Sequence, residues 1–217
     1  MDSEQLSPEE FDAHIQNGTF RLAFVGMSNA GKSYRSKVLH KELGFLWYHV
    51  DEEIAKALGK NTDGLAAWMG YPTSEGYSER EREYMDLENK FTLSVSMQTN
   101  GKNLVFDTTG SVVHLPRATL LSLRENCLVV HVDVGEASLD AMVEKFFANP
   151  KPVAWGGHLT IRTGENEEEA LRRSYPVLLQ GRLKAYRALA HVNVPALELR
   201  EQSADETLRI IRDKLLA

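Results

Sequence analysis

The chain has 217 residues with 25 basic and 31 acidic side chains, so its formal net charge is −6. This balance argues against a general nucleic-acid-binding or membrane-binding surface, although it is compatible with a local basic pocket. The single cysteine, Cys127, excludes a disulfide or a zinc framework within one chain, and no stretch is long and apolar enough to span a membrane, so we expect a cytoplasmic protein.

The first predicted element is a short helix that begins after Ser7 and ends near Gly18. Ser7 takes the N-cap position, Pro8 the first helical position, and Glu10 the position that completes a capping box. We expect residues 1–18 to form an N-terminal helical extension outside a single domain of residues 19–217.

A strand, a glycine-rich loop and a helix are predicted next. An apolar run at residues 20–25 leads into residues 26–33, which match the phosphate-binding pattern G-x-x-x-x-G-K-[ST] at every fixed position. A helical segment follows and stops at Gly44, a favourable residue for a helix C-terminus. The alternative interpretation is a tight strand–helix turn with a surface lysine.

Each fixed residue of this pattern has a physical role. Gly26 and Gly31 allow the backbone to curl so that amide N–H groups point into one anion-sized nest. Lys32 brings a positive charge to the β- and γ-phosphates, and the Ser33 hydroxyl is suited to Mg²⁺. The predicted nucleotide-binding residues are Gly26, Met27, Ser28, Asn29, Ala30, Gly31, Lys32, Ser33 and Tyr34.

Asp51 follows a second predicted strand, residues 45–50, and we expect it to cap a helix that extends through Leu58. A carboxylate at this place is suited to orient an acceptor hydroxyl and take its proton during phosphoryl transfer. An N-cap role is the alternative, and the two are compatible. His49 lies two residues earlier on the same side of the strand, and the pattern leaves open whether it faces a substrate.

Asp107 ends a third predicted strand, residues 103–107, and precedes the turn formed by residues 108–111. An acid at the end of this strand is placed to hold Mg²⁺ directly or through water. The alternative is an aspartate that caps the turn.

The remaining elements alternate between helices and strands. Helices are predicted at residues 62–69, 74–98, 115–124, 138–147, 165–190 (bent at Pro176) and 204–216, and strands at 127–134 and 191–194, with a mobile loop from 153 to 164. This alternation implies one parallel sheet covered by helices, an α/β fold. Ligands bind such sheets at the carboxyl ends of the strands, where Gly26, Asp51 and Asp107 converge.

Several anchors now occur in a recognisable order, and residues 20–217 resemble a shikimate kinase or a close relative among the small-molecule P-loop kinases. Besides the loop, the resemblance rests on Leu43-Gly44-Phe45 followed by Tyr48, Asp51 and Ile54, on residues 76–81, on Thr108-Thr109-Gly110-Ser111, on Lys151-Pro152 and on residues 182–190. It implies a three-layer P-loop NTPase fold with a five-stranded parallel sheet, ATP and Mg²⁺ as cofactors, a substrate-binding region around residues 51–82 and a lid around 145–164.

The resemblance also implies roles for individual residues. Gly110 would approach the acceptor through its backbone, and Arg182 would contact the substrate and the developing charge on the phosphates. A solvated helix arginine is the alternative for Arg182. Lys151 would be the basic residue of the lid.

The chain departs from the family pattern mainly on the acceptor side. His49 replaces the first aspartate of the family's Asp-x-Asp, and Thr109 and Ser111 replace two glycines of its triple-glycine turn. Ser78 stands where the arginine that grips the substrate carboxylate would be; Arg80, two positions away, is the candidate substitute. Lys151 replaces the lid arginine and loses bidentate geometry.

The leading hypothesis is an ATP-dependent kinase that phosphorylates a hydroxyl of a small metabolite, as a monomer or homodimer that binds no nucleic acid or membrane. Its predicted catalytic residues are Lys32, Asp51, Arg182 and Lys151; the predicted metal ligands are Ser33 and Asp107; and the predicted substrate contacts are Asp51, Arg80, Gly110 and Arg182. Two alternatives remain. One is an ATP-binding regulatory or assembly module with little catalysis, and the other is a sugar or nucleotide kinase of the same fold.

Overall fold

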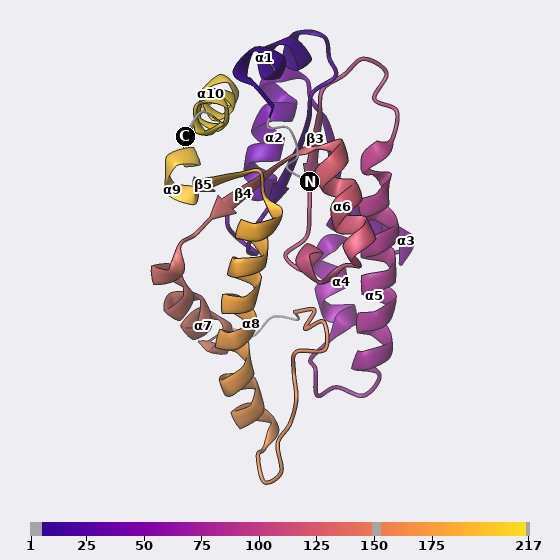
Figure 1. The fold of residues 1–217 in the computed structure, drawn as a ribbon. Helices are drawn as coiled ribbons and strands as arrows, with labels where there is room; N and C mark the ends of the chain where they lie inside the picture. Colours follow the sequence, from indigo (N-terminus) through magenta and orange to yellow (C-terminus); the bar gives the residue numbers. More distant parts are fainter. Residues whose placement is uncertain (1–5, 149–152, 216–217) are drawn as a thin grey trace.

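A five-stranded parallel sheet forms the centre of the protein (Figure 1), for which a computed structural model describes residues 6–148 and 153–215. The strand order is β2-β3-β1-β4-β5. The strands are β1 (Arg21–Val25), β2 (Leu46–His49), β3 (Leu104–Asp107), β4 (Leu128–Asp133) and β5 (Val192–Pro195). The five strands confirm the five apolar runs predicted from the sequence.

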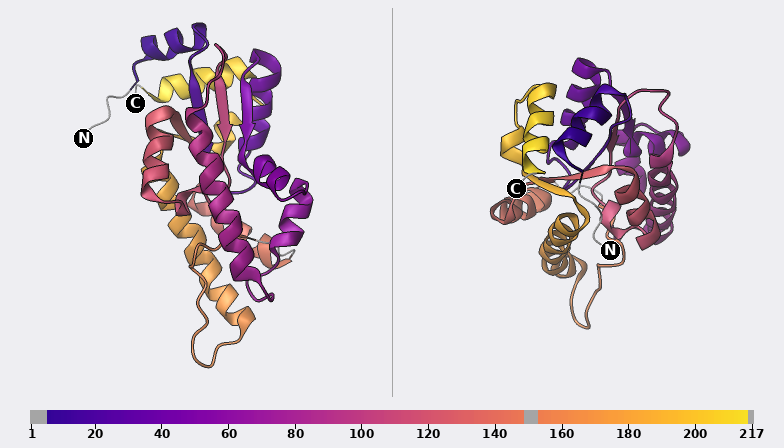
Figure 2. Two further views of the ribbon diagram at one scale, coloured as in Figure 1. Left: turned by 90° about the vertical axis from the view of Figure 1, so that its right-hand side faces the viewer. Right: turned by 45° about the horizontal axis from the view of Figure 1, so that its top comes forward.

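Helices lie on both faces of the sheet (Figure 2). Helix α2 packs against strands β1, β2 and β3, and α10 packs against β5. These two helices also contact each other, whereas α6 and α8 contact β4. The helices of the described residues are α1 (Pro8–Gln16), α2 (Lys32–Leu43), α3 (Val50–Ala57), α4 (Thr62–Met69), α5 (Tyr77–Thr92), α6 (Arg117–Asn126), α7 (Leu139–Ala148), α8 (Glu167–Leu189), α9 (Ala196–Leu199) and α10 (Ala204–Lys214), with short 3₁₀ turns η1 (Leu93–Ser96), η2 (Val112–His114) and η3 (Glu136–Ser138).

The three inner strands are buried because helices cover both faces of the sheet, as expected for parallel sheets. Strand β1 pairs with β3 and β4, which places Phe24 beside Asp107, and β2 pairs with β3, which places His49 beside Asp107. The carboxyl ends of β1, β2 and β3 therefore meet at one edge.

Local sequence signals account for several helix ends. Helix α1 has the predicted capping box between Ser7 and Glu10, and α2 ends at Gly44, which has a left-handed backbone. The predicted N-cap role of Asp51 is wrong, because α3 begins at Val50, two residues before the expected start, and His49 is its N-cap. Helix α5 is shorter than predicted, since the chain tightens into the 3₁₀ turn η1 after Thr92. Helix α9 was not predicted.

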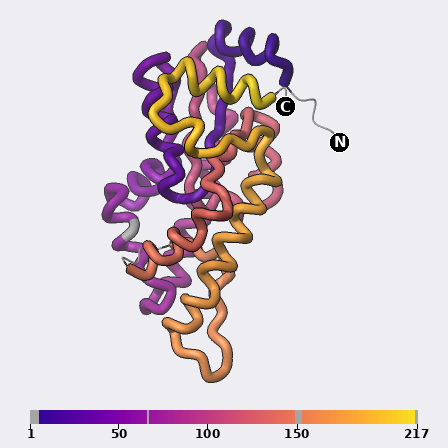
Figure 3. Tube along the Cα trace, turned by 90° about the vertical axis from the view of Figure 1, so that its left-hand side faces the viewer, coloured from indigo at the N-terminus to yellow at the C-terminus, as the bar shows by residue number. Residues whose placement is uncertain are grey.

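Helix α1 packs against the body of the fold. The Phe11 ring contacts the Phe20 ring edge-on at a centroid distance of 4.6 Å. Arg212 of α10 donates hydrogen bonds from two of its nitrogens to the carboxylate of Asp12. Figure 3 shows α1 and α10 side by side at the end of the molecule opposite the loop that precedes α8. No helix in residues 6–148 or 153–215 has the length and apolarity needed to cross a membrane.

Candidate active site

The glycine-rich loop connects the end of β1 to the start of α2. Gly26 has φ of 145°, and a side chain there would bring a Cβ to 2.8 Å from the Val132 carbonyl oxygen, so the close approach to β4 requires glycine. Gly31 is the N-cap of α2, which begins at Lys32 and directs its N-terminus at the loop. The predicted strand–loop–helix context is therefore confirmed.

Lys32 turns its ammonium group back into this loop. Nζ donates hydrogen bonds to the carbonyl oxygens of Gly26 at 2.9 Å and Met27 at 3.0 Å. Burial lowers the pKa of Lys32, while the charges of Asp107 and Asp51 oppose that shift. The structure thus holds one buried cation between the loop and two carboxylates.

Asp107 lies at the carboxyl end of β3 with both carboxylate oxygens buried and without a hydrogen-bond partner. Burial raises its pKa; Lys32, His49 and Ser33 act in the opposite direction. His49 Nε2 is 3.5 Å from Asp107 Oδ2. Two orphaned carboxylate oxygens close to a serine hydroxyl are a suitable donor set for a hard cation, so Asp107 and Ser33 fit the Mg²⁺ that a P-loop site requires.

Asp51 lies in the first turn of α3 and is held by α5. The Tyr84 hydroxyl donates a hydrogen bond of 3.0 Å to Asp51 Oδ1. Burial raises the pKa of Tyr84 well above its usual value, so this hydroxyl keeps its proton. One carboxylate oxygen of Asp51 is thereby fixed, which sets the direction of the other.

A cavity of about 370 Å³ is lined by predicted residues of both the nucleotide-binding and the acceptor side. Its residues come from the loop and the start of α2, from the end of β2, from α3–α5, from the turn after β3, from residues 153–154 and from α8. They are Ser28, Asn29, Lys32, Ser33, His49, Asp51, Thr62, Leu65, Met69, Tyr84, Thr108, Gly110, Ser111, Val153, Ala154 and Arg182.

Several predicted site residues do not line this cavity: Gly26, Met27, Ala30, Gly31, Tyr34, Asp107 and Arg80. The Arg80 guanidinium donates from Nε to the Met69 carbonyl oxygen at 3.1 Å and from Nη2 to that of Glu75 at 3.0 Å. Lys151 lies outside the described residues.

The turn after β3 is fixed by a buried acid, Glu88, which sequence reasoning missed. The hydroxyls of Thr109 and Ser111 both donate to its carboxylate, the second at 2.6 Å. Between them, Gly110 approaches the loop so closely that a Cβ would lie 2.7 Å from Ser28 Oγ. The two side chains that replace family glycines therefore bind one carboxylate and leave the middle glycine facing the cavity.

Arg182 reaches the cavity from α8 and has two partners in the described chain. Its Nε donates to His114 Nε2 at 2.9 Å, and its Nη2 donates to the carbonyl oxygen of Ala154. Burial, together with the charge of Arg182, lowers the pKa of His114 to about 4, so the ring is a neutral acceptor at neutral pH. No sequence pattern identifies His114, because a single histidine after a turn has no characteristic spacing.

The described part of the predicted lid contacts α5. The backbone N–H groups of Trp155 and Gly156 both donate to Glu81 Oε1, the second at 3.0 Å, and the Tyr77 hydroxyl donates to the Val153 carbonyl oxygen at 2.7 Å. Trp155 is buried, with its ring 5.8 Å from that of Tyr175. Figure 1 shows this segment running from the body along the lower part of α8.

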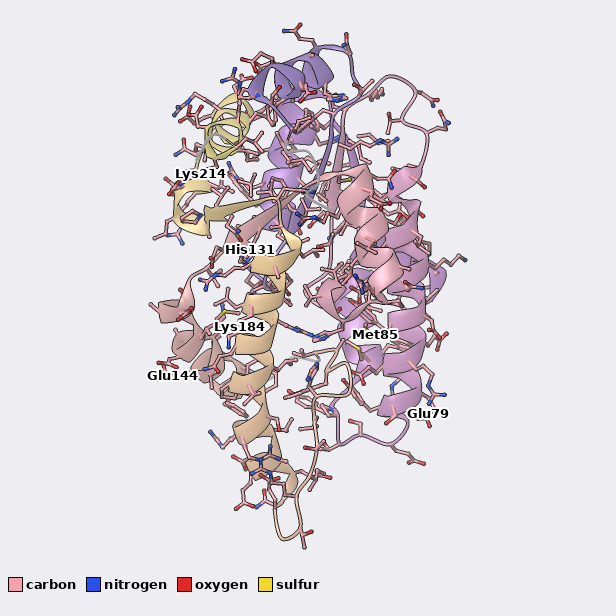
Figure 4. All side chains as sticks on the ribbon, viewed as in Figure 1. Glu79, Met85, His131, Glu144, Lys184 and Lys214 are labelled. Atoms are coloured by element: carbon pink, nitrogen blue, oxygen red, sulfur yellow. The ribbon has the colours of Figure 1, made fainter. Side chains whose placement is uncertain are left out.

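A second cavity, of about 660 Å³, lies on the other side of the glycine-rich loop. Asn29 lines both cavities, and Ala30, Gly31 and Tyr34 line only the larger. The remaining lining comes from Arg35 of α2, from the ends of β4 and β5 and from the segments that follow these two strands. At the end of β4, Arg187 of α8 donates to the carboxylate of Asp133 at 3.0 Å. Figure 4 labels His131 of β4, which lies beside α8. The His131 ring stacks on the ring of Tyr186 at a centroid distance of 5.4 Å.

The chain is similar in sequence to a known protein and in fold to several solved structures. No protein-family model matches the chain. A shikimate kinase from Dehalococcoides mccartyi is 24% identical over 194 residues, which cover 89% of this chain and 92% of that protein. The chain is therefore similar in sequence to a shikimate kinase.

Solved structures of shikimate kinases share the fold. The enzyme from Acinetobacter baumannii, in complex with shikimate, gives a TM-score of 0.62 at 18% identity and covers 95% of this chain and 97% of its own. The enzyme from Bacteroides thetaiotaomicron gives 0.59 at 18% identity, with 91% and 99% covered. The fold is that of these P-loop kinases, which confirms the predicted fold class.

Proposed function

We propose that this protein transfers the γ-phosphoryl group of ATP to a hydroxyl of a small metabolite. The observation that supports this function most directly is the convergence of Lys32, Asp107 and Asp51 at the carboxyl edge of the sheet, where the smaller cavity begins. A cation for phosphates, an acid for metal and an acid for an acceptor are the groups that phosphoryl transfer needs.

The donor half binds the nucleotide. The amides of residues 26–34 and the α2 N-terminus bind the phosphates, and the larger cavity receives the nucleoside. Lys32 exchanges its carbonyl partners for phosphate oxygens. Asp107 and Ser33 would hold Mg²⁺, which supplies positive charge to the β- and γ-phosphates.

The acceptor half positions the attacking hydroxyl. Asp51, oriented by Tyr84, accepts the hydroxyl proton as the acceptor oxygen bonds to the γ-phosphorus. The bond from that phosphorus to the bridging oxygen breaks, and ADP leaves with the electron pair. Arg182, together with Lys151 of the lid, neutralises the transferring group, and Gly110 contacts the acceptor through its backbone.

Substitution of Lys32 tests the assignment. We expect Lys32→Ala to reduce ATP consumption with an acceptor panel of shikimate, gluconate, nucleosides and nucleoside monophosphates by at least about 100-fold, because a phosphate-binding charge is lost. Lys37→Ala is the matched control, since Lys37 lies exposed on the same helix. ATP turnover by Lys32→Ala at the wild-type rate would contradict the proposed function.

Asp51 separates a kinase from a protein that only binds ATP. We expect Asp51→Asn to retain ATP binding, measured by calorimetry, and to lose transfer to the acceptor by at least about 100-fold, because the proton acceptor is removed. A pure ATP-binding module predicts no transfer in the wild-type protein and no effect of this substitution.

A further inference from the structure

The acceptor side of the smaller cavity combines charged and apolar groups. Given the proposed function, on which this inference rests, these groups limit the chemical class of the phosphoryl acceptor. We define the acceptor chamber by the lining residues beyond the phosphate-binding loop. They are His49, Asp51, Thr62, Leu65, Met69, Tyr84, Thr108, Gly110, Ser111, Val153, Ala154 and Arg182.

Arg182 is the arginine of this chamber among the described residues, and its guanidinium already has protein partners. Nε donates to His114 and Nη2 to the Ala154 carbonyl oxygen, so two of its three nitrogens have protein partners. A substrate carboxylate is bound most strongly by a free, bidentate guanidinium. Arg182 can therefore offer its charge and one nitrogen to a ligand, but it cannot bind a carboxylate through two free nitrogens in bidentate geometry.

The neighbouring arginine does not supply the missing clamp. Arg80 binds the carbonyl oxygens of Met69 and Glu75, one on each side of the connection between α4 and α5. These bonds hold that connection together and direct the guanidinium into it. Ser78, one helix position from Tyr77, is exposed on α5 and does not line the cavity.

Carboxyl groups border the chamber. Asp51 lines it directly, Asp107 lies at its donor end beside Lys32, and Glu88 is buried behind Ser111. Burial, and to a smaller extent the charge of Asp51, raises the pKa of the Glu88 carboxyl to about 7. An anionic acceptor would add a further negative charge to this group in a site of low dielectric.

Apolar side chains form the opposite wall. Leu65 and Met69 come from one face of α4, and Val153 and Ala154 from the segment that Glu81 and Tyr77 hold on α5. The polar groups on the chamber include the hydroxyls of Thr62, Tyr84, Thr108 and Ser111 and the ring of His49. Such a lining suits a ligand with hydroxyl groups on one side, which form hydrogen bonds, and with apolar carbon atoms on the other.

We propose that the phosphoryl acceptor is an uncharged hydroxyl compound with an apolar face, and that the site discriminates against hydroxy acids. Asp51 binds the reacting hydroxyl, while Leu65 and Met69 contact the carbon skeleton. Arg182 is directed at the transferring phosphoryl group.

Matched pairs of acceptors test this preference. The pairs are shikimate with methyl shikimate, gluconate with sorbitol, and glycerate with glycerol; each differs mainly in the carboxylate. ATP binding is measured first by calorimetry, and kcat/KM with MgATP is then measured for each compound. We expect the neutral member of the most active pair to exceed its acid by at least about tenfold, since an unclamped carboxylate must be desolvated beside Asp51.

The outcomes separate the two proposals. A hydroxy acid that exceeds its neutral partner in the most active pair overturns the acceptor inference and leaves the kinase assignment standing. ATP binding without transfer to any compound contradicts the kinase assignment itself, and the acceptor inference falls with it.

A variant pair checks that the charge balance of the chamber sets the preference. Met69→Arg adds a guanidinium to the apolar wall, and Met69→Gln is a neutral control of similar length. We expect the acid-to-neutral ratio of kcat/KM to rise by at least about tenfold in Met69→Arg relative to Met69→Gln, because a second cation allows a clamp. The ratio within one variant is independent of the fraction that folds. An equal ratio in the two variants would overturn the inference.

Discussion

Glu88 is a carboxyl whose protonation is set by its place in the core. It is fully buried, and burial raises its pKa from 4.5 to about 7, with Asp51 acting in the same direction and the hydroxyls of Ser111 and Thr109 opposing. The folded protein therefore retains a proton here that the unfolded chain releases at lower pH. Its stabilising effect is complete below pH 4.5 and is lost as pH rises through about 7.

This linkage predicts the pH dependence of stability. We expect the wild-type free energy of unfolding to lose about 3 kcal/mol through Glu88 between about pH 4 and pH 8. Glu88→Gln cannot titrate and still pairs with both hydroxyls, so its free energy of unfolding should fall less over that interval. Urea denaturation at several pH values measures the difference.

The control for this prediction is Glu83→Gln, which changes an exposed glutamate on the same helix. Its stability curve is expected to parallel that of the wild type. If the Glu88→Gln curve also runs parallel to the wild-type curve, Glu88 does not carry the extra proton.

Helix α5 links three parts of the site through one polar stripe. Tyr77, Glu81, Tyr84 and Glu88 recur at intervals of three and four residues, which places them on one helix face. They bind, in order, the Val153 carbonyl, the lid amides, Asp51 and the turn after β3. Movement of this helix would displace the lid and the acceptor groups together.

The lid contact of α5 depends on one carboxylate. Glu81→Ala leaves the N–H groups of Trp155 and Gly156 without their acceptor, which costs about 1–3 kcal/mol and raises the population of an undocked lid at least about fivefold. With Trp47 and Trp68 replaced by Phe, we expect acrylamide to quench the remaining Trp155 more strongly in Glu81→Ala.

The exposed Glu83→Ala provides the reference for this measurement because it changes the helix without touching the lid. Equal quenching in the two variants would show that Glu81 does not hold the lid segment.

Sequence patterns predict the site residues whose positions follow from local chain geometry. They miss the residues whose positions depend on the packing of one helix against distant segments. The loop, Asp51 and Asp107 were predicted because each follows a strand, and strand ends converge in any parallel sheet. Glu81 and Glu88 lie in a highly charged helix, where a solvated face is the usual interpretation. Only the packing of α5 against the lid and the β3 turn distinguishes them from exposed glutamates such as Glu83.

The N-terminal helix α1 contributes to the stability of the whole molecule. Phe11 is 2% exposed and meets Phe20 at the start of β1, so α1 shares the core of the sheet. We expect Phe11→Ala to lower the free energy of unfolding by about 3–5 kcal/mol, as large-to-small core substitutions do. Urea denaturation measures this loss, with exposed Glu9→Ala as the control.

A helix that is merely appended predicts a different result. Phe11→Ala would then leave the main unfolding transition within about 0.5 kcal/mol of the wild type, as surface substitutions usually do.

The resting position of Lys32 affects how quickly a nucleotide arrives. Its buried ammonium is held by two neutral carbonyl oxygens inside the loop, and the nearby carboxylates of Asp107 and Asp51 offset part of its charge. The remaining field, added to that of the α2 N-terminus, attracts polyphosphates toward the loop. Dissolved ions shorten the reach of such a field to about 10 Å at 0.1 M. Ionic strength therefore acts chiefly on the capture of the nucleotide, and much less on its release.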